Sequence, residues 1–178
     1  MVTLSEKIKM IIKIKKFIIN NNIDGYIIPK NDNYFTEYSN INNLKKVTNF
    51  TGSAGFALIL KKKNYLFVDG RYVLQAKRQS GKNFIILEIP YKWPKDISNI
   101  GKLSIGFDPK LFTEDILIKY FAKKTNLIPI RYHFDKLIKR KPDKIFHLNR
   151  SIVGETSFKK LNKIKNYLYS NKINYLYV

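Results

Sequence analysis

Hydrophobic residues recur along this chain with two different periods, which predict helices alternating with short strands. A Thr3-x-x-Glu6 capping box opens an apolar stripe, so the first helix is predicted to run to about 20–22. The stripe consists of Leu4, Ile8, Ile11, Ile12, Lys15, Ile18 and Ile19. Strands are predicted at 26–29, 55–61, 65–69, 84–89, 103–107 and 127–131, of which 55–61 and 65–69 form a hairpin. Helices are predicted at 72–79 and 115–124, and 92–100 is weakly helical. This order predicts an α/β fold in which one mixed β-sheet carries helices on its faces.

A turn of small residues, followed by two strands, is the most informative local pattern. Residues 49–55 read Asn-Phe-Thr-Gly-Ser-Ala-Gly, and the strand 65–69 stops at Asp69-Gly70 and is followed by Arg71. Strand ends on a rigid sheet commonly present functional side chains. The planar guanidinium of Arg71 suits a carboxylate or a peptide carbonyl, so this residue is the strongest functional candidate. Residues 30–46 are polar and irregular, so a long loop with one helical turn is predicted there, which is typical of a functional or contact segment.

The last quarter of the chain repeats the beginning in outline. The charged, Pro-containing segment 139–143 is the predicted boundary, which divides the chain into 1–142 and 143–178. An amphipathic helix is predicted over 154–170, and a strand over 173–178. One helix and one strand cannot bury their own apolar faces. We therefore expect 143–178 to be a linker plus the opening of a second, similar domain, and the chain to be an N-terminal fragment.

Composition limits the classes of function. The formal net charge is +21, but only five of the 34 basic residues are arginines, and the lysines are scattered through every segment. A lysine-rich solvated surface is therefore favoured, and nucleic-acid binding is unlikely. The chain has no cysteine, which excludes disulfides and thiolate sites. Lysines interrupt the apolar N-terminal residues, so we expect no signal peptide, no membrane partner and a cytoplasmic location.

Catalytic chemistry has few candidates. The two histidines, His133 and His147, have no acidic cluster in sequence around them, so no metal ligand is assigned. The turn containing Ser53 is not a phosphate loop, because it lacks the lysine and precedes a strand. Ser53 is not a nucleophile elbow either. We interpret the turn as a place where small residues let another element approach closely.

These residues also carry a family resemblance. NFTGSAG (49–55) and DGRYVLQA (69–76), with DGYIIP (24–29) and IGFDP (105–109), resemble the amino-terminal domain of Xaa-Pro aminopeptidases (aminopeptidase P), in the creatinase and prolidase superfamily. The loop residues Asp32, Tyr34, Glu37 and Tyr38 fit the same pattern. The family usually has an arginine near Asn43 and a glycine at Asn49, and asparagine tolerates the left-handed backbone expected there.

The resemblance implies a ribonuclease-H-like sheet and a role beside a catalytic domain that this sequence does not contain. That domain would hold two divalent metal ions, usually Mn(II), and this fragment would bind no cofactor. The resemblance further implies that Arg71 lines the substrate cleft. The expected partners are the protein's own catalytic domain, a Xaa-Pro peptide and a second copy in a homodimer. The fragment alone is predicted to be inactive.

Alternatives stay open at several positions. Arg71 is either a substrate contact or a corner residue pinned by Asp69 or Glu37, and both roles are compatible. Asp69 is expected to orient the turn. Asp32, Tyr34, Glu37, Tyr38 and Ser53 line either the cleft or an interface. For the whole chain, the alternatives are a non-catalytic interaction module of the same fold and, less favoured, a basic nucleic-acid binder.

Overall fold

A computed structural model describes residues 4–36, 42–134 and 146–177. The chain divides into two compact units, Met1–Lys136 and Leu137–Val178. The helices of the first unit are α1 (Leu4–Asn20), α2 (Asn43–Thr48), α3 (Val73–Ser80) and α4 (Glu114–Tyr120). Its strands are β1 (Gly25–Pro29), β2 (Gly55–Leu60), β3 (Asn64–Asp69), β4 (Ile85–Ile89), β5 (Ser104–Phe107) and β6 (Asn126–Pro129).

The six strands form one mixed sheet with the order β4-β3-β2-β1-β5-β6. Strand β2 is antiparallel to both β1 and β3, whereas the other pairings are parallel. The predicted hairpin is therefore confirmed as β2–β3, and the predicted mixed α/β sheet is confirmed as a whole. Because only β2 is reversed, the carboxyl ends of the remaining strands meet at one edge of the sheet.

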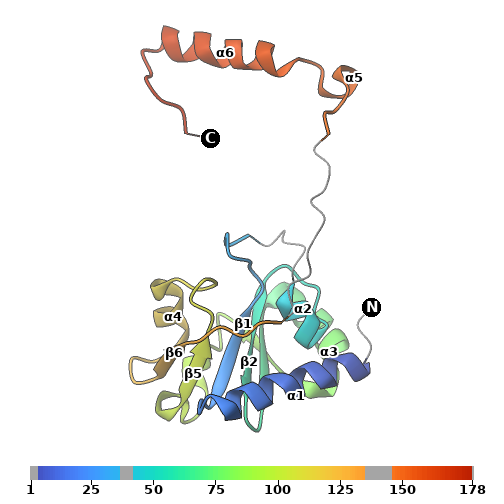
Figure 1. The fold of residues 1–178 in the computed structure, drawn as a ribbon, viewed down its shortest axis with the longest axis vertical. Helices are drawn as coiled ribbons and strands as arrows, with labels where there is room; N and C mark the ends of the chain where they lie inside the picture. The colour runs from blue at the N-terminus through green and yellow to red at the C-terminus, as the bar shows by residue number, and fades with distance from the viewer. Residues whose placement is uncertain (1–3, 37–41, 135–145, 178) are drawn as a thin grey trace. The chain divides into compact units, whose positions relative to one another are not determined.

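Helices cover both faces of the sheet, so the central strands are buried on both sides (Figure 1). Tyr26 and Ile28 of β1 face the helices α1, α2 and α3, and the neighbouring Ile27 points to the opposite face. That opposite face packs against α4, whose Leu117 is 7% exposed. The apolar stripe of α1 supplies Ile11, Ile14 and Ile18 to the first core, as its period predicts.

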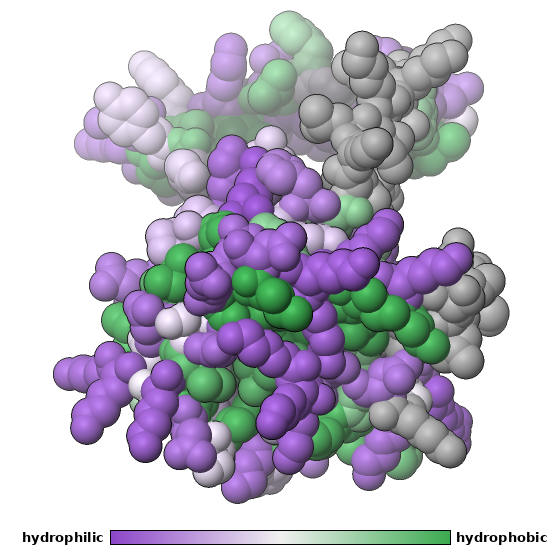
Figure 2. All heavy atoms as spheres, turned by 60° about the horizontal axis from the view of Figure 1, so that its bottom comes forward, coloured by the Kyte–Doolittle hydropathy of each residue, from purple (hydrophilic) through white to green (hydrophobic). Residues whose placement is uncertain are grey.

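The first unit presents a largely hydrophilic face. On the face drawn in Figure 2, hydrophilic side chains cover most of the unit, and hydrophobic side chains show between them. Ile8, Ile12 and Ile19 of α1 are among the exposed hydrophobic residues, so this part of the predicted stripe lies outside the core. No helix within the described parts of the chain is long and apolar enough to span a membrane.

Several predicted elements differ in the structure. The weakly helical 92–100 contains only short 3-10 turns, one over Pro94–Asp96 and another at Ile100–Lys102. The helix predicted at 115–124 is shorter, because Phe121 turns into an extended conformation and buries its ring in the core. Residues 30–46, predicted as a long loop with one helical turn, do contain helical residues at the start of α2; Asn42 caps this helix, and Asn49 ends it with φ 66°. The left-handed backbone expected at Asn49 is thus confirmed.

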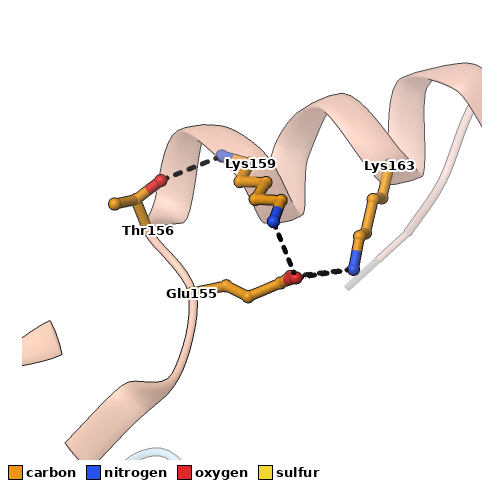
Figure 3. A network of polar contacts seen from close by, with 4 residues as sticks. All are labelled: Glu155, Thr156, Lys159 and Lys163. Carbon is orange, nitrogen blue, oxygen red and sulfur yellow. Dashed lines mark hydrogen bonds and ion pairs between the residues drawn. The ribbon is translucent and has the colours of Figure 1, made fainter. Parts of the chain in front are cut away.

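Over residues 146–177, the described part of the second unit, the structure has two helices where the sequence predicted one. These are α5 (Arg150–Val153) and α6 (Ser157–Ser170), separated at Gly154, whose φ is 71°. Thr156 caps α6 by accepting a hydrogen bond from the backbone N–H of Lys159, and Glu155 pairs with Lys159 and Lys163 (Figure 3). Residues 174–177 are not in a strand, so the strand predicted at 173–178 is wrong for the residues described.

The helices α1 and α6 nevertheless end in the same way. The side-chain amide of Asn21 donates to the Phe17 carbonyl at 2.8 Å, and that of Asn171 donates to the Tyr167 carbonyl at 2.8 Å. The next residue has φ 52° in the first unit and 53° in the second. The isoleucine that follows donates its backbone N–H to a carbonyl five residues back, at 3.2 Å and 2.9 Å respectively. Both are the hydrogen-bond pattern of a Schellman C-cap.

Candidate functional site

The predicted site residues gather at the edge of the sheet where β1 and β3 end and β2 begins. Pro29 of β1 lies opposite Phe56, and Gly55 of β2 lies opposite Val68 of β3. The ends of three adjacent strands are therefore aligned, although the first and last are separated by about forty positions in sequence. This register brings the loop after β1, the small-residue turn and the Asp69–Arg71 corner to the same edge.

Asp69 and Arg71 form the corner after β3. The Asp69 carboxylate accepts hydrogen bonds from the backbone N–H of Arg71 at 3.0 Å and from its Nε at 2.8 Å. These bonds, led by the one from the Arg71 side chain, hold the pKa of Asp69 below its ordinary value. The Arg71 side chain is 72% exposed, and its guanidinium lies 5.4 Å from the centre of the Tyr72 ring. The predicted pairing with Asp69 is thus present, while Glu37, the other predicted partner, lies outside the described residues.

Helix α3 holds the small-residue turn in place. The helix was predicted, but its hydrogen bonds to the turn were not. The Thr51 hydroxyl accepts hydrogen bonds from the side-chain amides of Gln75 and Gln79, each at 2.8 Å. The side-chain oxygen Oε1 of Gln79 in turn accepts a hydrogen bond from the backbone N–H of Thr51 at 2.9 Å. Ser53 shares a 2.8 Å hydrogen bond with the hydroxyl of Tyr72. The spacing of two glutamines by four positions, which places them on one helix face, was the available signal.

Glycine is required twice in this turn. A Cβ at Gly52 would lie 2.2 Å from the Phe50 ring, and one at Gly55 would lie 2.7 Å from the Phe67 carbonyl oxygen. Both distances are shorter than van der Waals contact allows. The interpretation of the turn as a place of close approach is therefore correct, and the approaching groups are Phe50 and strand β3 of the same unit.

A pocket of about 600 Å³ opens between this turn, the loop after β1 and the α4 region. Its lining consists of Pro29, Lys30, Asn31, Phe35, Thr36, Ser53, Gly55, Phe112, Ile116 and Tyr120. The Tyr120 ring is fixed by stacking, with its centre 4.2 Å from that of Phe56 and 5.3 Å from that of Trp93. Of the predicted site residues, Ser53 lines the pocket, whereas Asp69 and Arg71 lie farther along the edge.

The loop after β1 is organised by Asp32. Its carboxylate accepts hydrogen bonds from the backbone N–H of Tyr34 at 2.9 Å and of Thr36 at 3.0 Å, and from the Thr36 hydroxyl at 3.2 Å. The bonds from backbone N–H groups, Thr36 first, lower the pKa of Asp32. Tyr34 is 85% exposed and is not part of the pocket lining. The remaining predicted loop residues, Glu37 and Tyr38, lie outside the described residues.

The two histidines do not form a metal centre in the part of the chain that the structure describes. Across those residues, no group of three or more His, Cys, Asp or Glu side chains could hold a metal ion. The buried acidic residue Asp108, at the end of β5, pairs instead with Arg131 at 3.3 Å and accepts a hydrogen bond from the Lys110 backbone N–H at 3.0 Å. This pairing neutralises the one acidic group of the IGFDP segment.

Comparison with known protein families gives a match to the creatinase/prolidase N-terminal domain over residues 11–137. This range contains all six strands and the whole candidate edge. The chain belongs to the creatinase/prolidase N-terminal domain family. The resemblance found in the motifs of the sequence is thereby confirmed.

Similar proteins place this creatinase/prolidase-type domain within longer chains. A relative from Coprinopsis cinerea named "Probable Xaa-Pro aminopeptidase P" is 28% identical over 176 residues, which are 88% of this chain and 28% of that protein. The chain thus spans less than a third of that relative's length. The solved X-prolyl aminopeptidase from Caenorhabditis elegans, described as a cytosolic enzyme with a di-nuclear active site, is 22% identical. It superposes with a TM-score of 0.59 over 93% of this chain and 32% of its own.

A shorter solved chain also shares the fold. The Xaa-Pro aminopeptidase structure from Streptococcus thermophilus is 22% identical, with a TM-score of 0.53. The match covers 70% of this chain and 92% of that one. At these identities the two structures support the fold, while the family assignment rests on the sequence match.

Proposed function

We propose that this chain is the N-terminal, non-catalytic part of a Xaa-Pro aminopeptidase. The parent enzyme removes the N-terminal residue that precedes a penultimate proline. Proline lacks the amide hydrogen and has a fixed φ, so such peptides need a dedicated cleft. The observation that carries the proposal is the match of residues 11–137 to the family, together with relatives named for this activity.

In this proposal the described edge of the sheet forms part of the cleft mouth. Asp69 holds the Arg71 side chain at a corner where it is 72% exposed, and helix α3 fixes the neighbouring turn. A preordered guanidinium loses less conformational freedom when it binds a peptide carbonyl or carboxylate. Arg71 therefore contributes to substrate binding, while Asp69 positions it. Asp32 orders the loop that limits the length of the substrate.

The hydrolytic chemistry belongs to a catalytic domain beyond the matched region. There, two divalent metal ions, with Mn(II) expected, would activate a water molecule for attack on the scissile carbonyl. This chain contributes no ligand to them. We further propose that this chain contacts the catalytic domain and a second copy of the enzyme. The enzyme is proposed to act in the cytoplasm.

Residues 143–178, which lie within the second unit, begin another domain of the same type. Its support is the shared C-cap of α1 and α6, followed in both units by an isoleucine. In the first unit this arrangement leads directly into the central strand β1. The apolar side chains of Leu161, Ile164 and Leu176 are 40–55% exposed, as expected of a core whose other elements are not present.

Native protein captured from cell extract tests the proposal. Antibodies raised against this chain should precipitate a species larger than 178 residues that releases the first residue from Ala-Pro-Ala in the presence of Mn(II). The purified chain alone should release none. An inactive native species of 178 residues contradicts the proposal and favours the non-catalytic interaction module.

The role of Arg71 has a separate test in the enzyme of native length. Arg71→Ala should lower kcat/KM by about tenfold, because a charge-assisted contact to substrate is lost. Arg78→Ala is the matched control, since Arg78 is also exposed but lies on α3. Equal kcat/KM values for Arg71→Ala and Arg78→Ala would contradict substrate binding by Arg71 and leave it with a structural role only.

A further inference from the structure

Phe35 has an unusual backbone for a bulky side chain. Its φ is 59°, in the left-handed region where residues other than Gly, Asn and Asp are uncommon. The conformation is imposed locally: the Phe35 backbone N–H donates to the Asp32 carbonyl at 3.1 Å, and the Asp32 carboxylate binds Tyr34 and Thr36 on either side. Strained residues persist where the surroundings fix them, and they gather at binding sites.

The strained turn holds an aromatic ring at the pocket. Phe35 is 48% exposed and lines the pocket together with Phe112, Ile116 and Tyr120. Asn31 ties the loop to the opposite wall by donating to the Leu111 carbonyl at 3.0 Å. The volume of about 600 Å³ falls within the range of roughly 300–1,000 Å³ usual for ligand pockets. The walls are therefore preformed, and their apolar part is largely aromatic.

Hydrogen-bonding groups also lie at or beside the pocket. Ser53 and Tyr72 share one hydrogen bond, so one of their two O–H groups remains able to donate. Asn31 and Thr36 add polar atoms to the lining. A lining that combines aromatic and polar groups fits an aromatic side chain attached to a peptide backbone, because the ring can pack against the aromatic groups while the backbone bonds to the polar ones.

The geometry points to this pocket as a subsite for an aromatic side chain of the peptide substrate. The assignment rests on the function proposed above and adds a substrate class to it. Phe35 determines the preference by presenting its ring to that side chain. Asp32 acts as a positioning residue that keeps Phe35 in place.

Binding of short peptides to the 178-residue chain tests the assignment without requiring catalysis. The probes are the amides of Ala-Pro-Phe, Ala-Pro-Gly and Ala-Ala-Phe, titrated to about 10 mM and followed by the backbone NMR signals of Thr36, Ser53 and Gly55. Ala-Pro-Phe should bind about tenfold more tightly than Ala-Pro-Gly, since a buried aromatic contact supplies the difference. Equal affinities, or no saturable shifts with any probe, overturn the assignment.

Substitution of Phe35 separates binding from folding. Phe35→Asn removes the ring but suits the left-handed backbone, so the Tm should stay the same or rise while binding of Ala-Pro-Phe weakens about tenfold. Tyr34→Asn is the matched control, because Tyr34 is the exposed neighbour outside the pocket; its affinity should stay within about twofold of wild type. Wild-type affinity in Phe35→Asn contradicts the assignment.

The remaining probe distinguishes this inference from the proposed function. Ala-Ala-Phe binding at the same signals supports an aromatic subsite whether or not proline is read by this chain. If the native protein proves inactive on Ala-Pro-Ala while Phe-containing peptides still bind here, the proposed function fails and the pocket stands. If the native protein is active but the pocket shows no preference for phenylalanine, the proposed function is supported and the subsite assignment is overturned.

Discussion

Asn21 and Asn171 end two helices with the same hydrogen bonds, yet the residues around them differ completely in burial. Ile18 and Ile23, which frame the first cap, are 0% and 1% exposed. In the second unit Leu168 is only half-buried and Ile173 is 42% exposed. The first cap leads into a strand paired on both sides, whereas the described residues after the second cap form no strand. Local sequence is therefore sufficient for the cap, while the strand needs partners.

The largest expected difference between the two units comes from truncating matched core positions. Ile18→Ala should lower the free energy of unfolding by about 2–5 kcal/mol, because a fully buried side chain leaves a cavity. Leu168→Ala, at the equivalent position of α6, should change it by less than about 0.5 kcal/mol. Urea unfolding followed by circular dichroism measures both. A large loss in Leu168→Ala would show that the second unit already has a core.

Gly55 in the first unit and Gly154 in the second differ in how much room the structure leaves for an added Cβ. Gly55→Ala should destabilise the first unit by about 1–3 kcal/mol, because its Cβ would meet the Phe67 carbonyl oxygen on a strand that cannot move away. Gly154 has φ 71° but nothing within 4 Å of an added Cβ. Gly154→Ala should therefore cost only the backbone strain of about 1 kcal/mol, confined to the second unit. Thermal unfolding of both variants checks the order, and a milder effect at Gly55 would contradict the crowding argument.

A smaller difference between the two units is expected in how their stability responds to acid. The Lys61 side chain, and then the Ser104 backbone N–H, lower the pKa of Asp24 in the folded chain. A group whose pKa is lowered by folding stabilises above its unfolded pKa of about 3.9, and the contribution is lost as pH falls through the lower folded value. Asp24→Asn should therefore be less stable than wild type at pH 7, and the difference should shrink as the pH falls below about 4. Unfolding in urea across this range measures the difference, and a constant gap between the two proteins would contradict it.

Glu155 is the matched group in the second unit. Hydrogen bonding from Lys163 lowers its pKa, and the pair is exposed at the start of α6 (Figure 3). Protonation should reduce only the helix signal of α6, without moving the unfolding transition of the first unit. Glu155→Gln should abolish this small acid response, and high salt should weaken it in wild type because exposed pairs are screened. A response that persists in Glu155→Gln assigns it to another group.

Part of the candidate site followed directly from the sequence. The hairpin and the Asp69–Arg71 corner were predicted because each depends on residues close together in the chain. The pocket was not, since Asn31 reaches the Leu111 carbonyl across 80 positions and the Thr51 turn is held by glutamines 24 and 28 positions away. Phe35 was missed for the same reason: its importance depends on the position of α4 opposite the Asp32 turn.

By itself, the sequence determined the strands of the first unit, the left-handed Asn49 and the family. The strands and Asn49 depend on periodicity and on backbone preferences, which act within a few residues. Only the tertiary structure decided where helices end, as at Phe121, and which side chains share the pocket. It also decided that residues 174–177 remain outside a strand. The physical reason is that burial and strand pairing are properties of contacts between distant segments, so the same local pattern becomes a strand only where other strands complete it.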